Sequence, residues 1–232
     1  MILSLDKDEL QNYLIWQIDY RFPDRKSHFD FHDHMIAKAF DEGLERTENC
    51  FNHISIRGYE KDGECYFNHL HMDQYSQFLY FFSNSLWKLT DNQELCSKLI
   101  LLNRDMSGCW FSYKADFPDI FALVHPVGTV IGHVNVEFSD YLMILQNVTI
   151  NSLPDTTLKL GKGLLLAAGA KIIGGGYIGD RVSIGAGTTV KNPNVPDDYI
   201  VYRDDVTGAI VQKPNNKTNC FVQDYFKDML RE

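Results

Sequence analysis

Aliphatic residues recur at every sixth position along part of the C-terminal half of the chain. The series runs without a gap through Leu160, Leu166, Ile172, Ile178, Ile184 and Val190. A six-residue period fits neither an α-helix nor a regular strand, whose patterns repeat at about 3.6 and about 2 residues. It is typical of a solenoid in which short strands wind round a triangular core, with about 18 residues per coil. The pattern therefore predicts a parallel β-solenoid with these side chains inside.

The fourth residue after each aliphatic position also turns inward near a corner and should be small or apolar. These positions hold Leu164, Ala170, Gly176, Val182, Thr188 and Asn194. Upstream of the series two registers are possible. One places Val124, Val130, Val136, Leu142 and Val148 inside. The other uses Ile144 and Ile150, and reaches Ile131 after a one-residue slip near Phe138. We favour the second, because the first would bury Asp140 and Gln146.

Ten residues separate Ile150 from Leu160, where six would continue the period. The surplus predicts that residues 151–157 leave the solenoid as a short loop. Protruding loops of this kind often carry binding residues.

The N-terminal half follows the helical period instead. Four helices are predicted. The first follows Asp6 and stops at Pro23, and the second runs from about Asp33 to Leu44 and is ended by Gly43 and the polar stretch after it. The third follows Asp73, and the fourth begins at the Asp91–Glu94 capping box. The aromatic residues of the third helix fit either packing within a bundle or a contact between subunits. The expected class is α+β, with a helical domain at 1–115, a solenoid domain at 116–196 and a tail at 197–232 that ends in a short helix.

Composition narrows the function. The formal charge of -9 argues against general binding to nucleic acid or anionic membranes, which requires a basic surface. No apolar run is long enough to span a bilayer, and the acidic N-terminus does not match a signal peptide, so we expect no membrane insertion and a cytoplasmic location. The five cysteines are scattered without a CxxC pair, which favours buried free thiols over disulfides or a zinc site.

Several segments resemble one known family. These are His125-Pro-Val-Gly-Thr-Val-Ile-Gly132, Ile144-Leu-Gln-Asn-Val-Thr149, Leu166-Ala-Ala-Gly-Ala-Lys-Ile-Ile-Gly174 and Ile184-Gly-Ala-Gly-Thr-Thr-Val190. Together they resemble the serine acetyltransferases among the hexapeptide-repeat acyltransferases. The resemblance covers roughly residues 70–196. It implies a helical N-terminal domain, a left-handed β-helix, acetyl-CoA as co-substrate and a homotrimer that the helical half could pair into a hexamer.

The resemblance implies that His125 is the general base. An imidazole ordinarily titrates near pH 6.5 and can take the proton of an acceptor hydroxyl as it attacks a thioester. A carboxylate usually orients such a ring, and the candidates here are Asp119, ranked first, and Asp116.

The resemblance also places acetyl-CoA along small residues and near two lysines. Small residues let the pantetheine arm approach the backbone. The expected cofactor-binding residues are Ala167, Ala168, Gly169, Gly185, Ala186 and Gly187, with Lys171 and Lys191 near the phosphates.

The acceptor pocket departs from the family pattern. Val124 stands where serine acetyltransferases carry an Asp, and the 151–157 loop contains neither the Arg nor the His that they carry there. A zwitterionic serine needs charged partners, so we predict a carbohydrate or nucleotide-sugar hydroxyl as acceptor, with Asn147, Asn151 and Asp155 as candidate substrate-binding residues. Serine O-acetylation is the alternative.

Two further classes stay open. Similar solenoids serve as metal-dependent carbonic anhydrases, which need three converging imidazoles, but the solenoid offers only His125 and His133, so no metal is expected. His133 is expected on the exposed, slipped turn. A non-catalytic scaffold is the other class, and the retained His125 argues against it.

Overall fold

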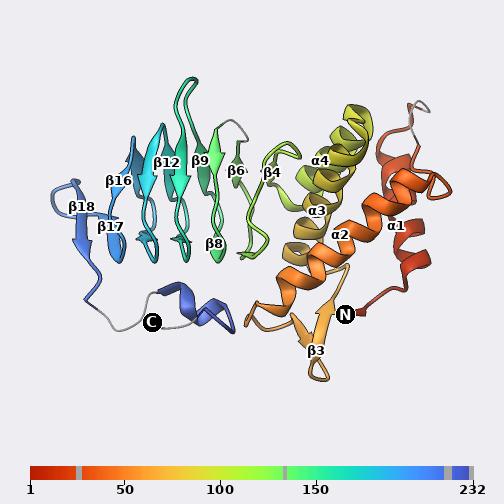
Figure 1. The fold of residues 1–232 in the computed structure, drawn as a ribbon, viewed down its shortest axis with the longest axis horizontal. Helices are drawn as coiled ribbons and strands as arrows, with labels where there is room; N and C mark the ends of the chain where they lie inside the picture. The colour runs from red at the N-terminus through yellow and green to blue at the C-terminus, as the bar shows by residue number, and fades with distance from the viewer. Residues whose placement is uncertain (25–27, 133–134, 217–220, 230–232) are drawn as a thin grey trace.

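The computed structural model describes residues 1–24, 28–132, 135–216 and 221–229. The helices of the N-terminal half are α1 (Lys7–Arg21), α2 (His34–Asn52), α3 (Met72–Thr90) and α4 (Gln93–Ser107). Beside them lies a small sheet of β1 (Ile2–Leu3), β2 (Glu60–Lys61) and β3 (Glu64–Phe67). Figure 1 shows the helical half at one end of the molecule and a stack of short strands at the other.

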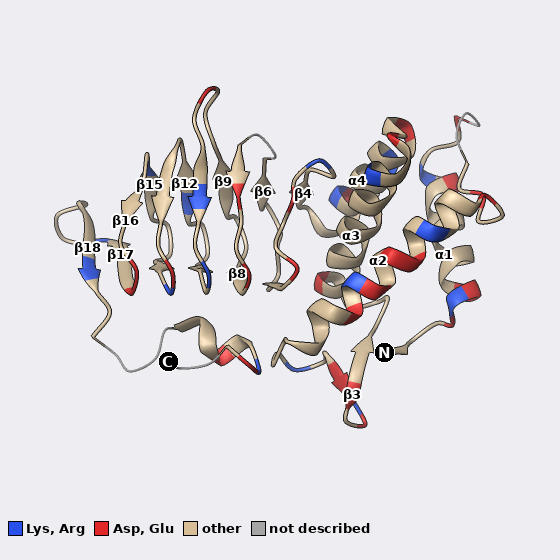
Figure 2. Cartoon of the chain, viewed as in Figure 1, with Lys and Arg blue, Asp and Glu red and all other residues tan. Residues whose placement is uncertain are grey.

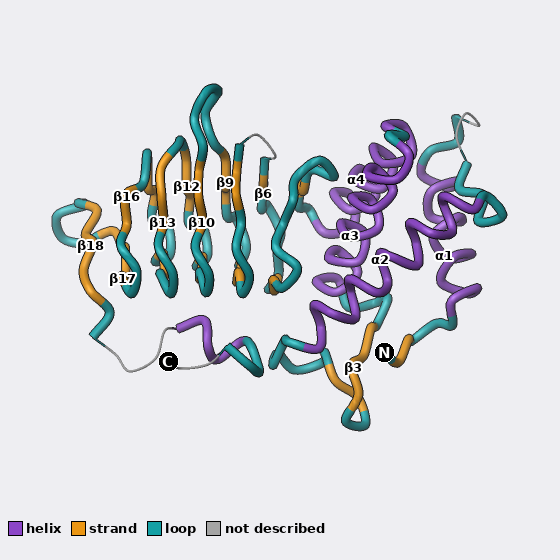
Figure 3. Tube along the Cα trace, in the orientation of Figure 1, coloured by secondary structure: helices purple, strands orange, loops and turns teal. Residues whose placement is uncertain are grey.

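The short strands form the three faces of a parallel β-solenoid. Face one contains β5 (Phe121–Leu123), β8 (Leu142–Ile144), β11 (Leu165–Leu166), β14 (Ser183–Ile184) and β17 (Tyr199–Arg203). Face two contains β4 (Trp110–Phe111), β6 (Val130–Ile131), β9 (Thr149–Asn151), β12 (Lys171–Ile173) and β15 (Thr189–Lys191). Face three contains β7 (Val136–Glu137), β10 (Leu158–Leu160), β13 (Gly176–Ile178) and β16 (Asn194–Val195). The division into a helical half and a strand half is clear in Figure 3.

The six-residue series forms the interior, as predicted. All six side chains from Leu160 to Val190 are at most 4% exposed. Ile172 pairs with Val190, 18 residues further on, so successive coils place equivalent side chains directly above one another. The predicted α+β fold with a parallel solenoid is confirmed.

Both irregularities of the period are also present. Ile131 pairs with Ile150, 19 residues on, which is one residue more than a regular coil, and Ile131 is buried while Val130 is 43% exposed. The favoured register was therefore the right one. Thr149 pairs with Lys171, 22 residues on, because the segment after β9 carries four extra residues. This loop rises above the other corners between β9 and β12 in Figure 1. His133 lies outside the described residues.

The prediction that Gly43 ends the second helix was wrong. Helix α2 continues to Asn52, and Gly43 is buried at its crossing with α3. A Cβ on Gly43 would lie 2.9 Å from the Cα of Phe82, so glycine here allows two helix backbones to approach closely. Tertiary packing, rather than a chain break, explains this glycine.

The substitution Gly43→Ala should destabilise the protein by about 1–2 kcal/mol, as overpacking against a backbone commonly does. Alanine's better helix propensity, worth about 1 kcal/mol, offsets part of the cost. Denaturant unfolding followed by circular dichroism would measure the effect. The exposed Glu45→Ala on the same helix is the control and should change stability by less than about 0.5 kcal/mol. Equal stability of Gly43→Ala and the native chain would contradict the steric argument.

The aromatic residues of α3 pack within the chain. Tyr75, Phe78, Phe81 and Phe82 are each fully buried, and Phe78 and Phe82 stack with their ring centroids 6.1 Å apart. Of the two interpretations, bundle packing is therefore confirmed. The four described cysteines are buried free thiols, and burial raises the pKa of Cys50 to about 12. Cys220 lies outside the described residues.

One face of α3 covers the open edge of the first solenoid coil. The Gln77 amide donates to the Phe121 carbonyl at 2.7 Å, the Tyr80 hydroxyl donates to the Ala115 carbonyl at 2.8 Å, and the Asn84 amide donates to the Tyr113 carbonyl at 2.8 Å. A parallel coil otherwise leaves such carbonyls unpaired at its end, and an unpaired buried carbonyl is costly. These buried polar side chains thus fix the helical half rigidly against the solenoid.

The tail packs back on the molecule and contains the predicted short helix, which is a 3-10 helix, η1 (Phe221–Tyr225). Phe226 pairs with Ile54 beyond the end of α2 and lies edge-on to Tyr141 of the solenoid, with ring centroids 5.3 Å apart. The tail therefore bridges the two halves (Figure 1). No helix within the described residues has the length and apolarity that a membrane span requires.

Candidate active site

His125 lies on the turn that joins β5 to β6, at the corner between face one and face two. This turn is two residues longer than the turn stacked on it, because Leu123 pairs with Ile144 while Val130 pairs with Thr149. The backbone of His125 has a left-handed φ of 49°, and its side chain is 82% exposed. The longer turn therefore pushes the imidazole out of the corner and into solvent.

Hydrogen bonds to the neighbouring coil hold this turn. The buried Thr129 hydroxyl donates to the Leu145 carbonyl at 3.0 Å and accepts from the Val148 N–H at 3.2 Å. The Val127 N–H donates to the His125 carbonyl at 2.7 Å within the turn. An exposed imidazole on a firmly held backbone is suited to proton transfer.

The carboxylate nearest to the imidazole comes from the helical half. The His125 N–H donates to Asp73 Oδ2 at 3.2 Å, and the same oxygen lies 4.0 Å from His125 Nδ1. Asp73 is in the first turn of α3 with its side chain only 8% exposed. Burial, followed by the charge of this carboxylate, raises the pKa of Tyr59 well above its ordinary value. Asp73 thus anchors the backbone of His125 and places a negative charge beside its Nδ1 edge.

The structure does not bring Asp116 or Asp119 together with His125. Asp116 forms an ion pair with Lys88 at 2.7 Å. Asp119 precedes β5 and His125 follows it, so the three-residue strand, about 10 Å long at about 3.3 Å per residue, separates them. Within the described part of the chain, neither carboxylate has a hydrogen bond or ion pair with His125.

The sequence did contain a signal for Asp73. Asp73, Gln77, Tyr80 and Asn84 follow one another at helical spacing, and all face the first solenoid coil. A row of polar residues in an otherwise aromatic helix indicates a surface that meets backbone groups. What this row contacts could be known only once the helix was docked.

Small residues form a column at the same corner as His125. The Asn147 N–H donates to the Val127 carbonyl, the Gly169 N–H to the Gln146 carbonyl and the Gly187 N–H to the Ala168 carbonyl, at 2.8–2.9 Å. The turns therefore stack coil by coil from His125 to Ala186. A Cβ on Gly187 would meet nothing within 4 Å, so the outer end of the column is open.

The remaining predicted cofactor residues lie along this column. Ala167, Ala168, Gly169 and Gly185 are half-buried, whereas Ala186 and Gly187 are exposed. Lys171 and Lys191 are exposed on face two, where Lys171 is the first residue of β12 and Lys191 the last of β15. The six small residues thus lie at the turns between face one and face two, whereas Lys191 lies at the far end of β15 from this corner. Figure 2 shows basic residues in blue along the solenoid.

The three predicted substrate-binding residues differ in their contacts within the chain. Asn147 has a left-handed φ of 57°, and its side chain fills the space above Gly128, where a Cβ would lie 2.2 Å from Asn147 Oδ1. Asn151 packs in the same way over Gly132, at 2.5 Å from a Cβ placed there. Asp155 is exposed in the protruding loop. Asn147 and Asn151 therefore have a structural role, because their side chains pack against glycines of the neighbouring coil.

No set of three His, Cys, Asp or Glu side chains within the described ranges is arranged to hold a metal ion. His69 in the helical half is instead hydrogen-bonded, with its Nδ1 2.8 Å from the Ser4 hydroxyl.

Comparison with known proteins gives a consistent result. No family model matches the chain. The serine acetyltransferase of Salmonella typhimurium is 35% identical over 98 residues, which cover 40% of this chain and 34% of that protein. The serine acetyltransferase of Synechococcus elongatus is 37% identical over 81 residues, which cover 33% of this chain and 32% of that protein. The chain spans about a third of the length of these curated relatives.

Solved structures match over a longer stretch. A serine acetyltransferase in complex with CoA superposes with a TM-score of 0.60 at 20% identity, covering 76% of this chain and 74% of that one. The serine acetyltransferase of Brucella abortus gives a TM-score of 0.57 at 19% identity, covering 90% and 77%. The chain is thus similar to serine acetyltransferases in sequence over 33–40% of its length and in fold over most of it. Its resemblance to the serine acetyltransferases thus extends from the solenoid motifs to the combination of helical half and solenoid.

Proposed function

We propose that the protein is an acetyl-CoA-dependent O-acetyltransferase with His125 as general base. The observation that carries the proposal is the continuity of the His125 turn with the column of small-residue turns at one corner of the solenoid. The named relatives, all serine acetyltransferases, support the same chemistry.

In the proposed reaction the acceptor hydroxyl lies beside the imidazole. His125 takes its proton as the oxygen attacks the thioester carbonyl of acetyl-CoA, and the proton then passes to the departing thiolate of CoA. Asp73 Oδ2, beside Nδ1, favours the tautomer with its proton on Nδ1, which leaves Nε2 free to take the proton of the acceptor. The same carboxylate stabilises the imidazolium formed in the transfer.

The residues of the column fit the binding of acetyl-CoA. Half-buried and exposed small residues at Ala168, Ala186 and Gly187 leave the backbone accessible to a pantetheine arm. Lys171 and Lys191 supply positive charge on the adjoining face for phosphate groups. We place the co-substrate along this edge.

Two acceptors follow from different observations. The relatives' name favours serine, which was the alternative from the sequence rather than its first choice. A carbohydrate hydroxyl is the second candidate, because Val124 beside His125 is aliphatic and the loop at 151–157 offers no cation for a serine carboxylate.

A thiol-release assay with acetyl-CoA tests the proposal and separates these acceptors. L-serine, N-acetyl-D-glucosamine, D-galactose and UDP-N-acetylglucosamine are supplied in turn, and free CoA is measured with a thiol reagent. Release above the acceptor-free rate with any of them supports acetyl transfer. Failure with the whole panel, together with no measurable CoA binding by calorimetry, would favour the scaffold interpretation.

We further propose a homotrimer, because an exposed general base at a solenoid corner gains a closed site when a neighbouring copy covers it. The helical halves could pair two trimers into a hexamer. Light scattering should give a mass that is a multiple of three times the 26.7 kDa chain, and a monomeric mass would contradict this.

A further inference from the structure

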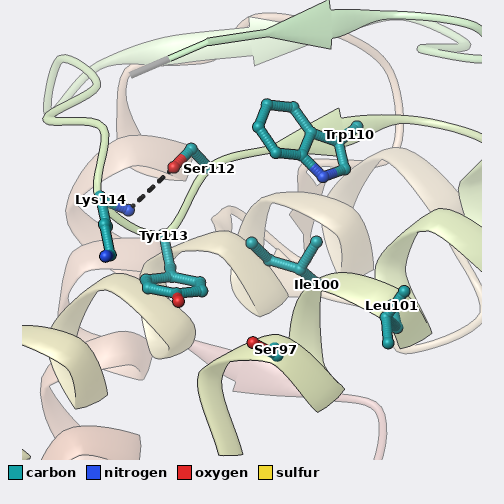
Figure 4. A pocket seen from close by; sticks show the side chains of 7 residues that line it. All are labelled: Ser97, Ile100, Leu101, Trp110, Ser112, Tyr113 and Lys114. Atoms are coloured by element: carbon teal, nitrogen blue, oxygen red, sulfur yellow. Dashed lines mark hydrogen bonds between the residues drawn. The ribbon is translucent and has the colours of Figure 1, made fainter. Parts of the chain in front are cut away.

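A concave site lies where α4 meets β4, the first strand of the solenoid. This α4–β4 pocket has a volume of about 400 Å³ and is lined by Ser97, Ile100, Leu101, Trp110, Ser112, Tyr113 and Lys114. Figure 4 shows the side chains of α4 on one side and those of β4 and the segment after it on the other. Pockets of this size are typical of small-molecule sites.

The walls combine flat apolar surfaces with hydrogen-bonding groups. Trp110 and Tyr113 provide rings, and Ile100 and Leu101 provide aliphatic contacts. The Ser112 hydroxyl, on a residue 4% exposed, accepts from the Lys114 backbone N–H at 3.2 Å and donates to no acceptor among the described residues. The combination of ring faces and hydroxyls suits a sugar ring, whose C–H face is apolar and whose edge carries hydroxyls.

Lys114 adds a cation at the rim. Its ammonium lies 4.5 Å from the ring centroid of Trp87 and 5.8 Å from that of Tyr113. It forms no ion pair with a carboxylate of the described residues. Its three N–H donors can therefore reach the oxygens of a ligand.

The pocket lies on the coil next to the His125 turn. The Trp110 N–H donates to the Thr129 carbonyl at 2.8 Å, and Trp110 pairs with Val130. Val130 is 43% exposed and Val127 is 59% exposed. Because Val130 is the β6 partner of Trp110 and Val127 lies in the turn of His125, exposed apolar residues lie between that turn and β4. A ligand whose hydroxyl reacts at His125 could extend along these residues.

We propose that the α4–β4 pocket binds the non-reacting part of a carbohydrate acceptor. This inference rests on the proposed acetyl transfer and favours the second of its two acceptors. It assigns Trp110 as the stacking surface, and Ser97, Ser112 and Lys114 as the hydrogen-bonding groups.

Two variants test the pocket. Ser97→Phe fills it from α4, and Trp110→Ala removes one ring. Glu94→Phe, exposed one turn earlier on α4, is the matched control. Binding of N-acetyl-D-glucosamine and D-galactose is followed by saturation-transfer NMR without acetyl-CoA, and KM for the same sugars is measured in the thiol-release assay. We expect both pocket variants to weaken sugar binding and raise KM at least tenfold, while the control and KM for acetyl-CoA stay unchanged.

The outcomes separate this inference from the proposed function. Sugar binding that is absent, or that Ser97→Phe leaves unchanged, overturns the pocket assignment even if serine is acetylated. Sugar binding that both variants abolish supports the pocket even if no acceptor releases CoA, a result that would count against the proposed transfer alone.

Discussion

Replacing His125 with alanine should lower turnover by about 10²- to 10⁴-fold, the usual contribution of a positioned general base. The imidazole is exposed at the solenoid corner, and the column of turns beside it does not depend on its ring. CoA affinity measured by calorimetry should therefore stay within about threefold of the native value, equivalent to less than about 1 kcal/mol. Steady-state thiol release with the best acceptor of the panel gives the turnover.

Backbone conformation needs a control in this experiment. His125 has a left-handed φ of 49°, which alanine tolerates poorly and asparagine better. His125→Asn should therefore keep native stability and still lose turnover. His32→Ala, at an exposed histidine of the helical half, should retain full activity. Native turnover in His125→Asn would remove His125 from the role of base.

Loss of the Asp73 carboxylate should lower turnover by about 10²- to 10³-fold, less than the loss of a complete triad carboxylate, because Asp73 lies 4.0 Å from Nδ1 rather than within a hydrogen bond. Two variants divide its roles. Asp73→Asn keeps an oxygen that can accept from the His125 N–H but carries no charge. Asp73→Ala loses both functions.

If the charge orients and stabilises the imidazole, Asp73→Asn loses nearly as much turnover as Asp73→Ala, while KM for acetyl-CoA stays unchanged. If Asp73 only anchors the backbone, Asp73→Asn retains native turnover, and the proposed orienting role is then wrong. Asp116→Asn and Asp119→Asn are matched controls, since neither carboxylate contacts His125 in the described structure. Both should remain active, and thermal unfolding monitors the folding of all four variants.

The solenoid could be predicted in detail because its signal is local and periodic. Each interior position from Leu160 to Val190 can be recognised as buried from its own residue type, since a polar residue there would have no hydrogen-bond partner. The same physical reason selected the register through Ile131 and located the loop after Ile150. Periodicity could not interpret Gly43, where an apparent helix stop is a close contact with Phe82.

The sequence by itself determined the class of fold and the places of His125 and of the small residues at 167–169 and 185–187 in the solenoid, because all of these lie in short segments whose spacing is fixed by the coil. Their expected roles came from the resemblance to the serine acetyltransferases. Only the tertiary structure decided which carboxylate accompanies His125. Asp119 is close in the chain but lies beyond an extended strand, whereas Asp73 is distant in the chain and is brought to His125 by α3 as it covers the open edge of the first coil. The α4–β4 pocket likewise exists only through docking, since a helix and a strand from different halves form its two walls.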